Sequence, residues 1–188
     1  MNQPTNALER KTKISDLARA AVMTAVTCVL APLSVPIGPV PISLTNFAIF
    51  LSLYLLNWKW ATGSYLVYLL IGMIGMPVFS GFTGGIAKLA GPTGGYLVGF
   101  IPMAIVTGMV IDRKPNHAVQ FLAMIVGTII CYVFGTAWFC LESGTPVGAA
   151  LTACVFPFIP GDLLKIVLAM ILGPAIRSQL VKAHLMKE

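Results

Sequence analysis

Two charged residues near the C-terminus, Asp162 and Lys165, offer the clearest chemistry in the chain. They are three residues apart, so a helix would present both on one face. Ionisable groups inside a membrane cost about 2.5–3.5 kcal/mol on insertion scales and usually mark a functional site. Structural roles compete with this interpretation, since Asp162 follows Pro160 and Gly161 and could cap a helix, and Lys165 could extend to the interface. If the two residues instead form a binding site, they suit a polar ligand that has N–H donors and a carboxylate.

A second polar pair, Thr45 and Asn46, lies one turn into another apolar segment. An asparagine amide donates and accepts hydrogen bonds at once. Within a membrane helix it could bind a ligand or join a neighbouring helix. The sequence favours neither role, so both residues are candidates for ligand contact.

The stretch PVFSGFTGGIAKLAGPTGGY, residues 77–96, separates two strongly apolar runs and contains six glycines and two prolines. It has neither the G-x-x-x-x-G-K-[ST] nor the G-x-G-x-x-G pattern of a phosphate-binding loop, so it predicts no nucleotide site. Pro92, Gly94 and Gly95 imply defined turns rather than a slack linker. We expect a lid whose backbone and flanking aromatic rings contact the ligand. Its candidate contacts are Phe79, Phe82, Gly84, Gly85, Thr93 and Tyr96.

Residues for catalysis or metal binding are scarce. The chain has six carboxylates, and only Asp162 and Glu142 lie near the predicted pocket, with no Ser-His-Asp arrangement. Its four cysteines form no C-x-x-C pair and lie in apolar runs, and neither histidine has a ligand at helical spacing. We therefore expect no catalytic residue, no metal and no cofactor.

The composition places the chain among membrane proteins. It has 188 residues, of which 57% are hydrophobic and 10% charged, whereas charged residues make up about a quarter of a soluble domain. The net charge of +6 comes from basic residues beside apolar segments. That pattern indicates orientation in a membrane rather than nucleic-acid binding.

The apolar runs predict a single all-α membrane domain of six transmembrane helices. A spanning helix needs about 20 mostly apolar residues, and the candidates are residues 14–33, 42–58, 61–79, 95–111, 118–141 and 162–176. Residues 147–160 are also apolar, but Pro157 and Pro160 interrupt them. That segment is expected to be an interfacial or re-entrant helix, and residues 1–13 a cytoplasmic tail.

The distribution of basic residues predicts that both termini are cytoplasmic. With six spans and the termini inside, inner segments carry ten of the twelve basic residues, the outer segments carry Lys88, and Lys165 lies within the last span. Three Gly- or Pro-rich segments, 35–41, 77–96 and 157–162, then face outward. Non-helical backbone near a membrane needs cover from protein or a cavity. We expect these segments to cap a ligand pocket.

Ala18, Ala21 and Ala25 lie at helical spacing in the first apolar segment. Small residues at such spacing allow another helix to approach closely. The alanines could serve a partner subunit or packing within the chain, and the sequence leaves both open.

Three stretches resemble the BioY family, the biotin-specific substrate-binding S components of energy-coupling factor (ECF) transporters. They are PVPISLTNF (39–47), YLLIGMIGMPVFSGFTGGIAKLAGPTGGYLVGF (68–100) and GDLLK (161–165), and the similarity runs from about Ala18 to Ile176. Many relatives have Gln where this chain has Asn46. The resemblance implies a multi-pass protein of the bacterial plasma membrane with an outward-facing pocket that binds biotin with high affinity.

The resemblance also implies partners: a transmembrane coupling subunit of the EcfT type and two cytoplasmic ATPases, with ATP used only by those subunits. Ala21 and Ala25 match the alanine motif that contacts the coupling subunit in the family. Some relatives occur without dedicated ATPases, which leaves the energising route open. Membrane lipid is the last partner that we expect for this protein.

Biotin carries a ureido ring, an apolar thioether bicycle and a valerate carboxylate, so it matches the polar residues identified above. Asp162 could accept from the ureido N–H groups, Asn46 or Thr45 could contact the carbonyl, and Lys165 could pair with the valerate or lie at the ring. An S component for another small vitamin is an alternative, as is a membrane enzyme for a small apolar substrate. A structural or assembly protein would have no need of the outer Gly- and Pro-rich cap.

Overall fold

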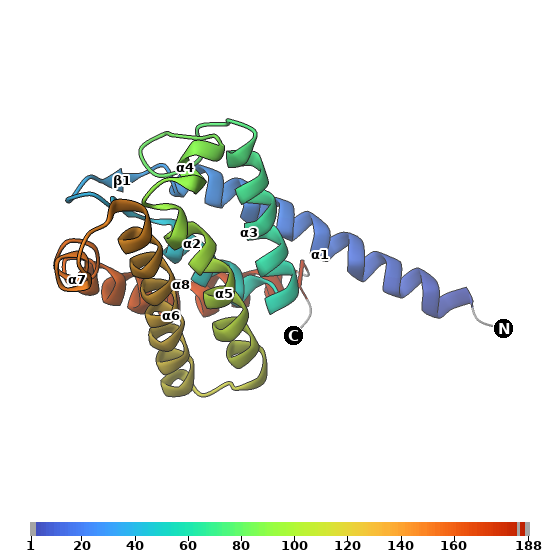
Figure 1. Ribbon diagram of the computed structural model, residues 1–188. Coiled ribbons are helices and arrows are strands. Elements are labelled where there is room, and N and C mark those ends of the chain that lie inside the picture. Colours follow the sequence, from blue (N-terminus) through green and yellow to red (C-terminus); the bar gives the residue numbers. More distant parts are fainter. Residues whose placement is uncertain (1–2, 184, 187–188) are drawn as a thin grey trace.

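The computed structural model describes residues 3–183 and 185–186, with side chains described from Ile14 onward. Most of the chain is helical, and the helices pack into one bundle from which the start of α1 projects (Figure 1). The helices are α1 (Gln3–Leu30), α2 (Thr45–Leu55), α3 (Trp58–Met73), α4 (Ile86–Ala90), α5 (Gly94–Arg113), α6 (His117–Ser143), α7 (Val147–Cys154) and α8 (Ile159–Lys182).

Within the described residues, three helices are long and apolar enough to cross a membrane: α5, α6 and α8. They coincide closely with three of the predicted spans, 95–111, 118–141 and 162–176. Asn116 begins α6 by accepting a hydrogen bond from the Ala118 N–H, and Gly144 ends it in the left-handed conformation. The chain is therefore a mostly helical membrane protein.

The second predicted span, 42–58, differs from the structure at both ends. Residues Ile42–Ser43 form strand β2, which pairs antiparallel with β1 (Ser34–Val35), so α2 begins only at Thr45. At the other end Asn57 accepts hydrogen bonds from the N–H groups of Lys59 and Trp60 and starts α3. The resulting α2 has 11 residues and is about 16 Å long, roughly half the hydrocarbon thickness of a bilayer.

Two glycines bring α5 and α6 unusually close together. A side chain added at Gly95 would place its Cβ 2.2 Å from Cβ of Trp138, and one added at Gly135 would place it 2.2 Å from the ring of Tyr96. Only hydrogen leaves room for these contacts. The close packing fixes Tyr96 against α6, where its hydroxyl lies near Thr136 and the Cys154 carbonyl.

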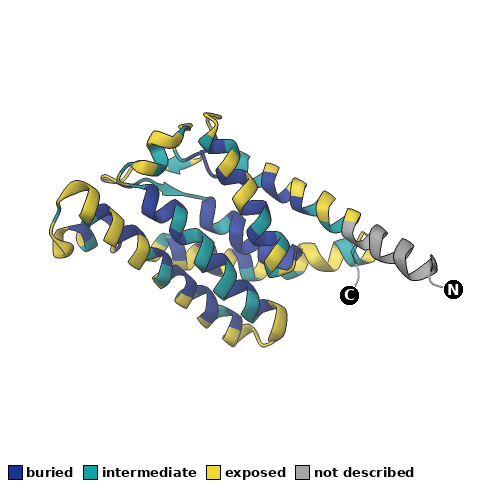
Figure 2. Ribbon diagram, turned by 45° about the vertical axis from the view of Figure 1, so that its right-hand side comes forward, coloured by how far each residue is buried: buried dark blue, intermediate teal, exposed yellow. Residues whose placement is uncertain are grey.

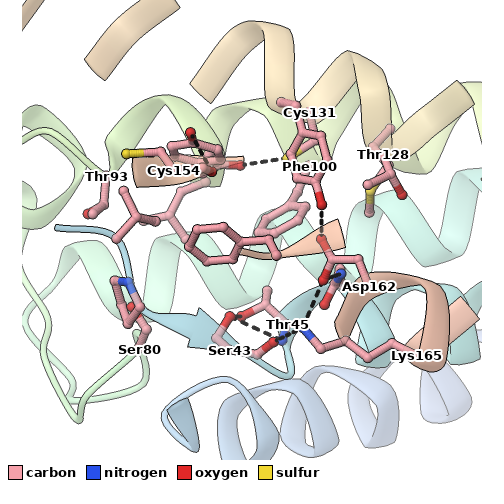
Figure 3. Close-up of a pocket in the computed structure, with 18 residues that line it drawn as sticks. Ser43, Thr45, Ser80, Thr93, Phe100, Thr128, Cys131, Cys154, Asp162 and Lys165 are labelled. Carbon is pink, nitrogen blue, oxygen red and sulfur yellow. Dashed lines mark hydrogen bonds and ion pairs between the residues drawn. The ribbon is translucent and has the colours of Figure 1, made fainter. Parts of the chain in front are cut away.

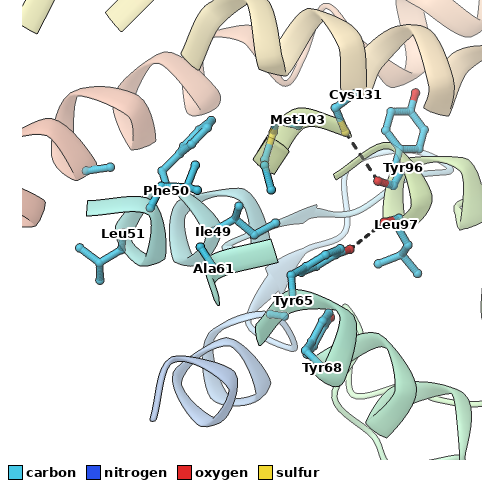
Figure 4. Packing of buried hydrophobic residues seen from close by; sticks show 14 of the residues in the cluster. Ile49, Phe50, Leu51, Ala61, Tyr65, Tyr68, Tyr96, Leu97, Met103 and Cys131 are labelled. Carbon is cyan, nitrogen blue, oxygen red and sulfur yellow. Dashed lines mark hydrogen bonds between the residues drawn. The ribbon is translucent and has the colours of Figure 1, made fainter. Parts of the chain in front are cut away.

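The core combines aliphatic side chains with aromatic rings on α2, α3 and α5 (Figure 4). Tyr65 is buried, packs edge-on against Phe100, and donates a hydrogen bond to the Leu97 carbonyl at 2.8 Å. Thr24 of α1 and Ser64 of α3 share a buried hydrogen bond of 2.9 Å. These contacts tie α3 to α5 and to α1, and α5 contributes to the pocket described below.

The Gly-rich stretch 77–96 is more ordered than a slack loop. It contains helix α4 and a bridge between Phe79 and Thr83. Its backbone is tied to other elements by the Gly85 N–H, which donates to the Gly72 carbonyl at 2.7 Å, and the Gly81 N–H, which donates to the Pro32 carbonyl at 3.1 Å. Figure 1 shows α4 beside the strand region and at the opposite end of α5 from the α5–α6 turn.

The segment 147–160, expected as one interfacial helix, divides into two parts. Helix α7 covers Val147–Cys154, and after a short turn α8 begins at Ile159, with Pro160 in its first turn. Proline is well tolerated there because the first N–H groups of a helix have no partner inside it. This early start gives Asp162 its place in the first turn of α8.

Candidate ligand-binding site

A buried carboxylate organises the polar end of the pocket (Figure 3). Asp162 is 6% exposed, and it receives three side-chain hydrogen bonds from three helices. Its Oδ1 accepts from Asn46 Nδ2 of α2 at 2.8 Å and from Lys165 Nζ of α8 at 3.0 Å. Its Oδ2 accepts from the Tyr132 hydroxyl of α6 at 2.5 Å. The carboxylate therefore joins α2, α6 and α8 at one point.

Lys165 neutralises this carboxylate. Lys165 is 8% exposed, and its ammonium lies in an ion pair with Asp162, one turn away along the same helix. It also donates to the backbone carbonyl of Ser43 in β2 at 2.6 Å. Because residues three apart share a helix face, both side chains are buried together, and the interior carries a compensated pair rather than a lone charge.

Several hydrogen-bonding positions at this end remain available for a ligand. A carboxylate has about four acceptor positions and an ammonium three donors, whereas the structure uses three on Asp162 and two on Lys165. The Asn46 amide has one further N–H, and its Oδ1 accepts only from the Phe47 N–H. Both donors and acceptors can therefore be offered to a single polar group.

The pocket that contains these groups has about 660 Å³ of space between its atoms, a volume that includes its open mouth. Only about 60 Å³ of this space is wide enough for the centre of a water molecule. The enclosed part of the pocket is thus narrow in this conformation. The lining comes from the strand region, α2, α5, α6, α7 and α8, and from Ser80 and Thr93 at the two ends of the Gly-rich stretch.

The pocket has polar groups at both ends and rings between them. Figure 3 shows Ser80 and Thr93 on one side, Asp162 and Lys165 on the other, and Phe100 between. Phe158 and Tyr96 add further aromatic lining. Small-ligand sites are commonly mostly apolar with a few placed polar groups, and this one has that character.

Six of the ten predicted contact residues line the pocket, brought together from three helices and the loop before α5: Thr45, Asn46, Thr93, Tyr96, Asp162 and Lys165. The other four lie outside the lining. Phe79 is fully buried and packs edge-on against Tyr68, and Phe82 is 65% exposed. Gly84 packs against the backbone of Met76, and Gly85 starts α4.

Sequence reasoning missed Tyr132, Ser43 and Phe158. Tyr132 lies in the middle of a long apolar segment, where a tyrosine hydroxyl needs a partner, but nothing in the sequence names Asp162 as that partner. Ser43 acts through its backbone carbonyl, which any residue would supply. Phe158 lies in the turn before α8, beside the prolines that indicated only an interruption.

The three alanines singled out on α1 lie away from the pocket. Ala18, Ala21 and Ala25 are all exposed, on the face of α1 opposite the buried Met23 and Thr27. Figure 2 shows this alternation of buried and exposed positions along the helix. Packing within the described part of the chain therefore does not occupy this small-residue face.

A bundle of apolar, membrane-length helices around a buried pocket with polar ends defines a membrane protein that binds a small ligand. Residues 3–182 match the BioY family. The chain is 39% identical to the biotin transporter BioY of Thermotoga maritima, over 84% of this chain and 92% of that protein. It is 34% identical to the probable biotin transporter BioY of Pyrococcus horikoshii, over 88% and 98% respectively. The chain belongs to the BioY family.

A solved structure agrees with this assignment at the level of the fold. It is the crystal structure of the S-component for biotin from an ECF-type ABC transporter, 31% identical in sequence. The TM-score is 0.82, and the match covers 89% of this chain and 93% of that one.

Proposed function

We propose that this protein captures biotin for uptake as the S component of an ECF-type transporter. The observation that carries the proposal is the Asp162–Lys165 pair, buried at the end of a narrow pocket in a chain of the BioY family. The protein is a transport subunit and not an enzyme, since the relatives named above are biotin transporters.

The charges of the pocket favour one orientation of the ligand. Lys165 is already paired with Asp162, so this end has no net charge to attract a carboxylate. A ureido ring is neutral and has two N–H donors and one carbonyl, which matches the unused positions on Asp162, Lys165 and Asn46. We therefore place the ring at this end, the thioether bicycle beside Phe100, and the valerate toward Ser80 and Thr93.

The Gly-rich stretch 77–96 is the proposed lid. Ser80 and Thr93, close to its two ends, line the pocket, whereas Gly84 and Gly85 lie between them outside the lining. Those glycines support movement rather than direct contact, because they allow backbone conformations that other residues adopt at a cost. The narrow interior supports the same conclusion, since a ligand can enter only when the walls separate.

We place the protein in the bacterial plasma membrane with six crossings and both termini in the cytoplasm. The bias of ten basic residues to one side supports this topology. The exposed Ala18, Ala21 and Ala25 would contact an EcfT-type coupling subunit, and two ATPases would supply the energy.

Radiolabelled biotin binding to the purified, detergent-solubilised chain tests the proposal. We expect saturable binding of one biotin per chain, recovered unmodified, with excess unlabelled biotin displacing the label and thiamin or riboflavin failing to do so. Displacement by another vitamin at lower concentration would instead favour an S component of different specificity. Chemical change of the biotin would indicate an enzyme.

A further inference from the structure

A second cavity, which we call the lateral groove, opens between α6, α7 and α8 on the far side of Tyr132. It has about 1,280 Å³ of space between its atoms, its open side included. Its lining comes from α6 (Ile125, Thr128, Ile129, Tyr132, Val133, Thr136, Ala137 and Cys140), α7 and the turn after it (Val147, Leu151 and Val155), and α8 (Ile159, Asp162, Leu163 and Ile166).

The hydroxyl groups that line the lateral groove already have hydrogen-bond partners. Thr128 donates to the Met124 carbonyl at 2.8 Å, Thr136 shares a hydrogen bond with Tyr96, and Tyr132 donates to Asp162. A buried water needs two to four polar partners, and the remaining wall is aliphatic. The occupant is therefore apolar.

The dimensions of the groove favour a hydrocarbon chain over a protein helix. From Ile125 to Cys140 it follows α6 for about 22 Å at 1.5 Å per residue. Its volume, the open side included, then corresponds to a mean cross-section of at most roughly 60 Å², too little to enclose a helix 10–12 Å in diameter, whose section is roughly 80–110 Å². One leaflet of a bilayer contributes about 15 Å of hydrocarbon, so an acyl chain can lie along it.

We infer that an acyl chain of a membrane phospholipid occupies the lateral groove. Two of its walls are helices long and apolar enough to cross a membrane, and exposed aliphatic residues such as Ile129 and Val133 lie along the groove. Thr128, Tyr132 and Asp162 line both the groove and the ligand pocket. The acyl chain thus packs against Tyr132 on the side away from the ligand pocket. Tyr132 is the residue whose hydroxyl donates a hydrogen bond to Asp162. The inference rests on the membrane setting of the proposed function, but not on the identity of the vitamin.

Photo-crosslinking tests this inference without any vitamin. The protein is placed in nanodiscs of phosphatidylglycerol that carries a diazirine within one acyl chain, irradiated, and mapped by peptide mass spectrometry. The internal control is a set of aliphatic residues on α1 with similar exposure: Val22 and Val29 are 61% and 67% exposed, against 53% and 62% for Ile129 and Val133. We expect labelling of the groove residues at least three-fold above that of the α1 pair.

A groove-filling substitution, Ala137→Phe, should reduce this labelling to the level of α1. The matched control is Ala175→Phe, at an exposed position of α8 outside the groove, and it should leave the labelling unchanged. Val133→Trp provides a second filling variant if Ala137→Phe does not fold. Equal labelling of Val133 and Val22 in the wild type would overturn the inference.

Discussion

The Asp162 carboxylate combines two roles at the level of single residues, because it joins three helices and also forms the polar end of the pocket. Breaking a buried ion pair by removing one partner costs about 3–5 kcal/mol, since the remaining charge is left uncompensated. Experiments on this residue must therefore separate the loss of binding from the loss of folding.

Asp162→Asn should weaken biotin binding by about 10- to 100-fold, because hydrogen bonds to a charged group contribute about 1.5–3 kcal/mol. Equilibrium binding of labelled biotin gives the dissociation constant. Glu142→Gln makes the same chemical change at an exposed position and should have no effect. The double variant Asp162→Asn with Lys165→Met removes both charges, so it should recover thermal stability without recovering binding. Unchanged affinity in Asp162→Asn would remove Asp162 from the site.

Tyr132→Phe should weaken biotin binding by about 3- to 10-fold, since one hydrogen bond to the carboxylate is lost and the ring is kept. The same binding assay measures this effect. Tyr54→Phe is the matched control, because Tyr54 donates to Gln120 away from the pocket. If both variants bind biotin as tightly as the wild type, the Tyr132 hydroxyl plays no part in the ligand site.

At the scale of elements, the proposed lid can be tested by hydrogen exchange. Amides of residues 80–93 should exchange more slowly when biotin is bound, because closure of the lid shields them and reduces local opening. The turn at residues 114–116, at the opposite end of α5, should not change. Equal exchange with and without biotin would exclude a lid.

The close packing of α5 on α6 makes a second prediction at this scale. Gly135→Ala would place a Cβ 2.2 Å from the Tyr96 ring, and overpacking of this kind costs about 1–3 kcal/mol. We expect a lower melting temperature and weaker biotin binding, since Tyr96 lines the pocket. Gly63→Ala, on α3 with open space around it, should be neutral or slightly stabilising. A stable Gly135→Ala variant with normal binding would contradict this account of the helix contact.

At the scale of the whole molecule, capture and transport should be separable. Ala21→Trp with Ala25→Trp enlarges the exposed face of α1 far from the pocket. Such a change should leave binding to the isolated chain intact and reduce biotin uptake by at least five-fold in cells that also express the coupling subunit and ATPases. Ala149→Trp, an exposed position on α7, is the control. Normal uptake by the double variant would place the coupling surface elsewhere.

The sequence by itself determined the class of protein and much of its chemistry. Apolar runs separated by basic residues define membrane helices whatever their packing, and α5, α6 and α8 follow them closely. Asp162 and Lys165 were identifiable because charges are rare in such runs, and their shared helix face follows from their spacing. Both residues line the pocket, as do four uncharged candidates, Thr45, Asn46, Thr93 and Tyr96.

Only the tertiary structure decided which groups meet. Asn46, Tyr132 and Asp162 are far apart in the chain, and their contact depends on how α2, α6 and α8 rotate and shift against one another. The local sequence pattern does not reveal the burial of Phe79 or the backbone contact of Ser43. Both depend on neighbours that come from other elements. The strand pairing that shortens α2 likewise depends on hydrogen bonds between residues 34–35 and 42–43, which a helical pattern of apolar residues does not predict.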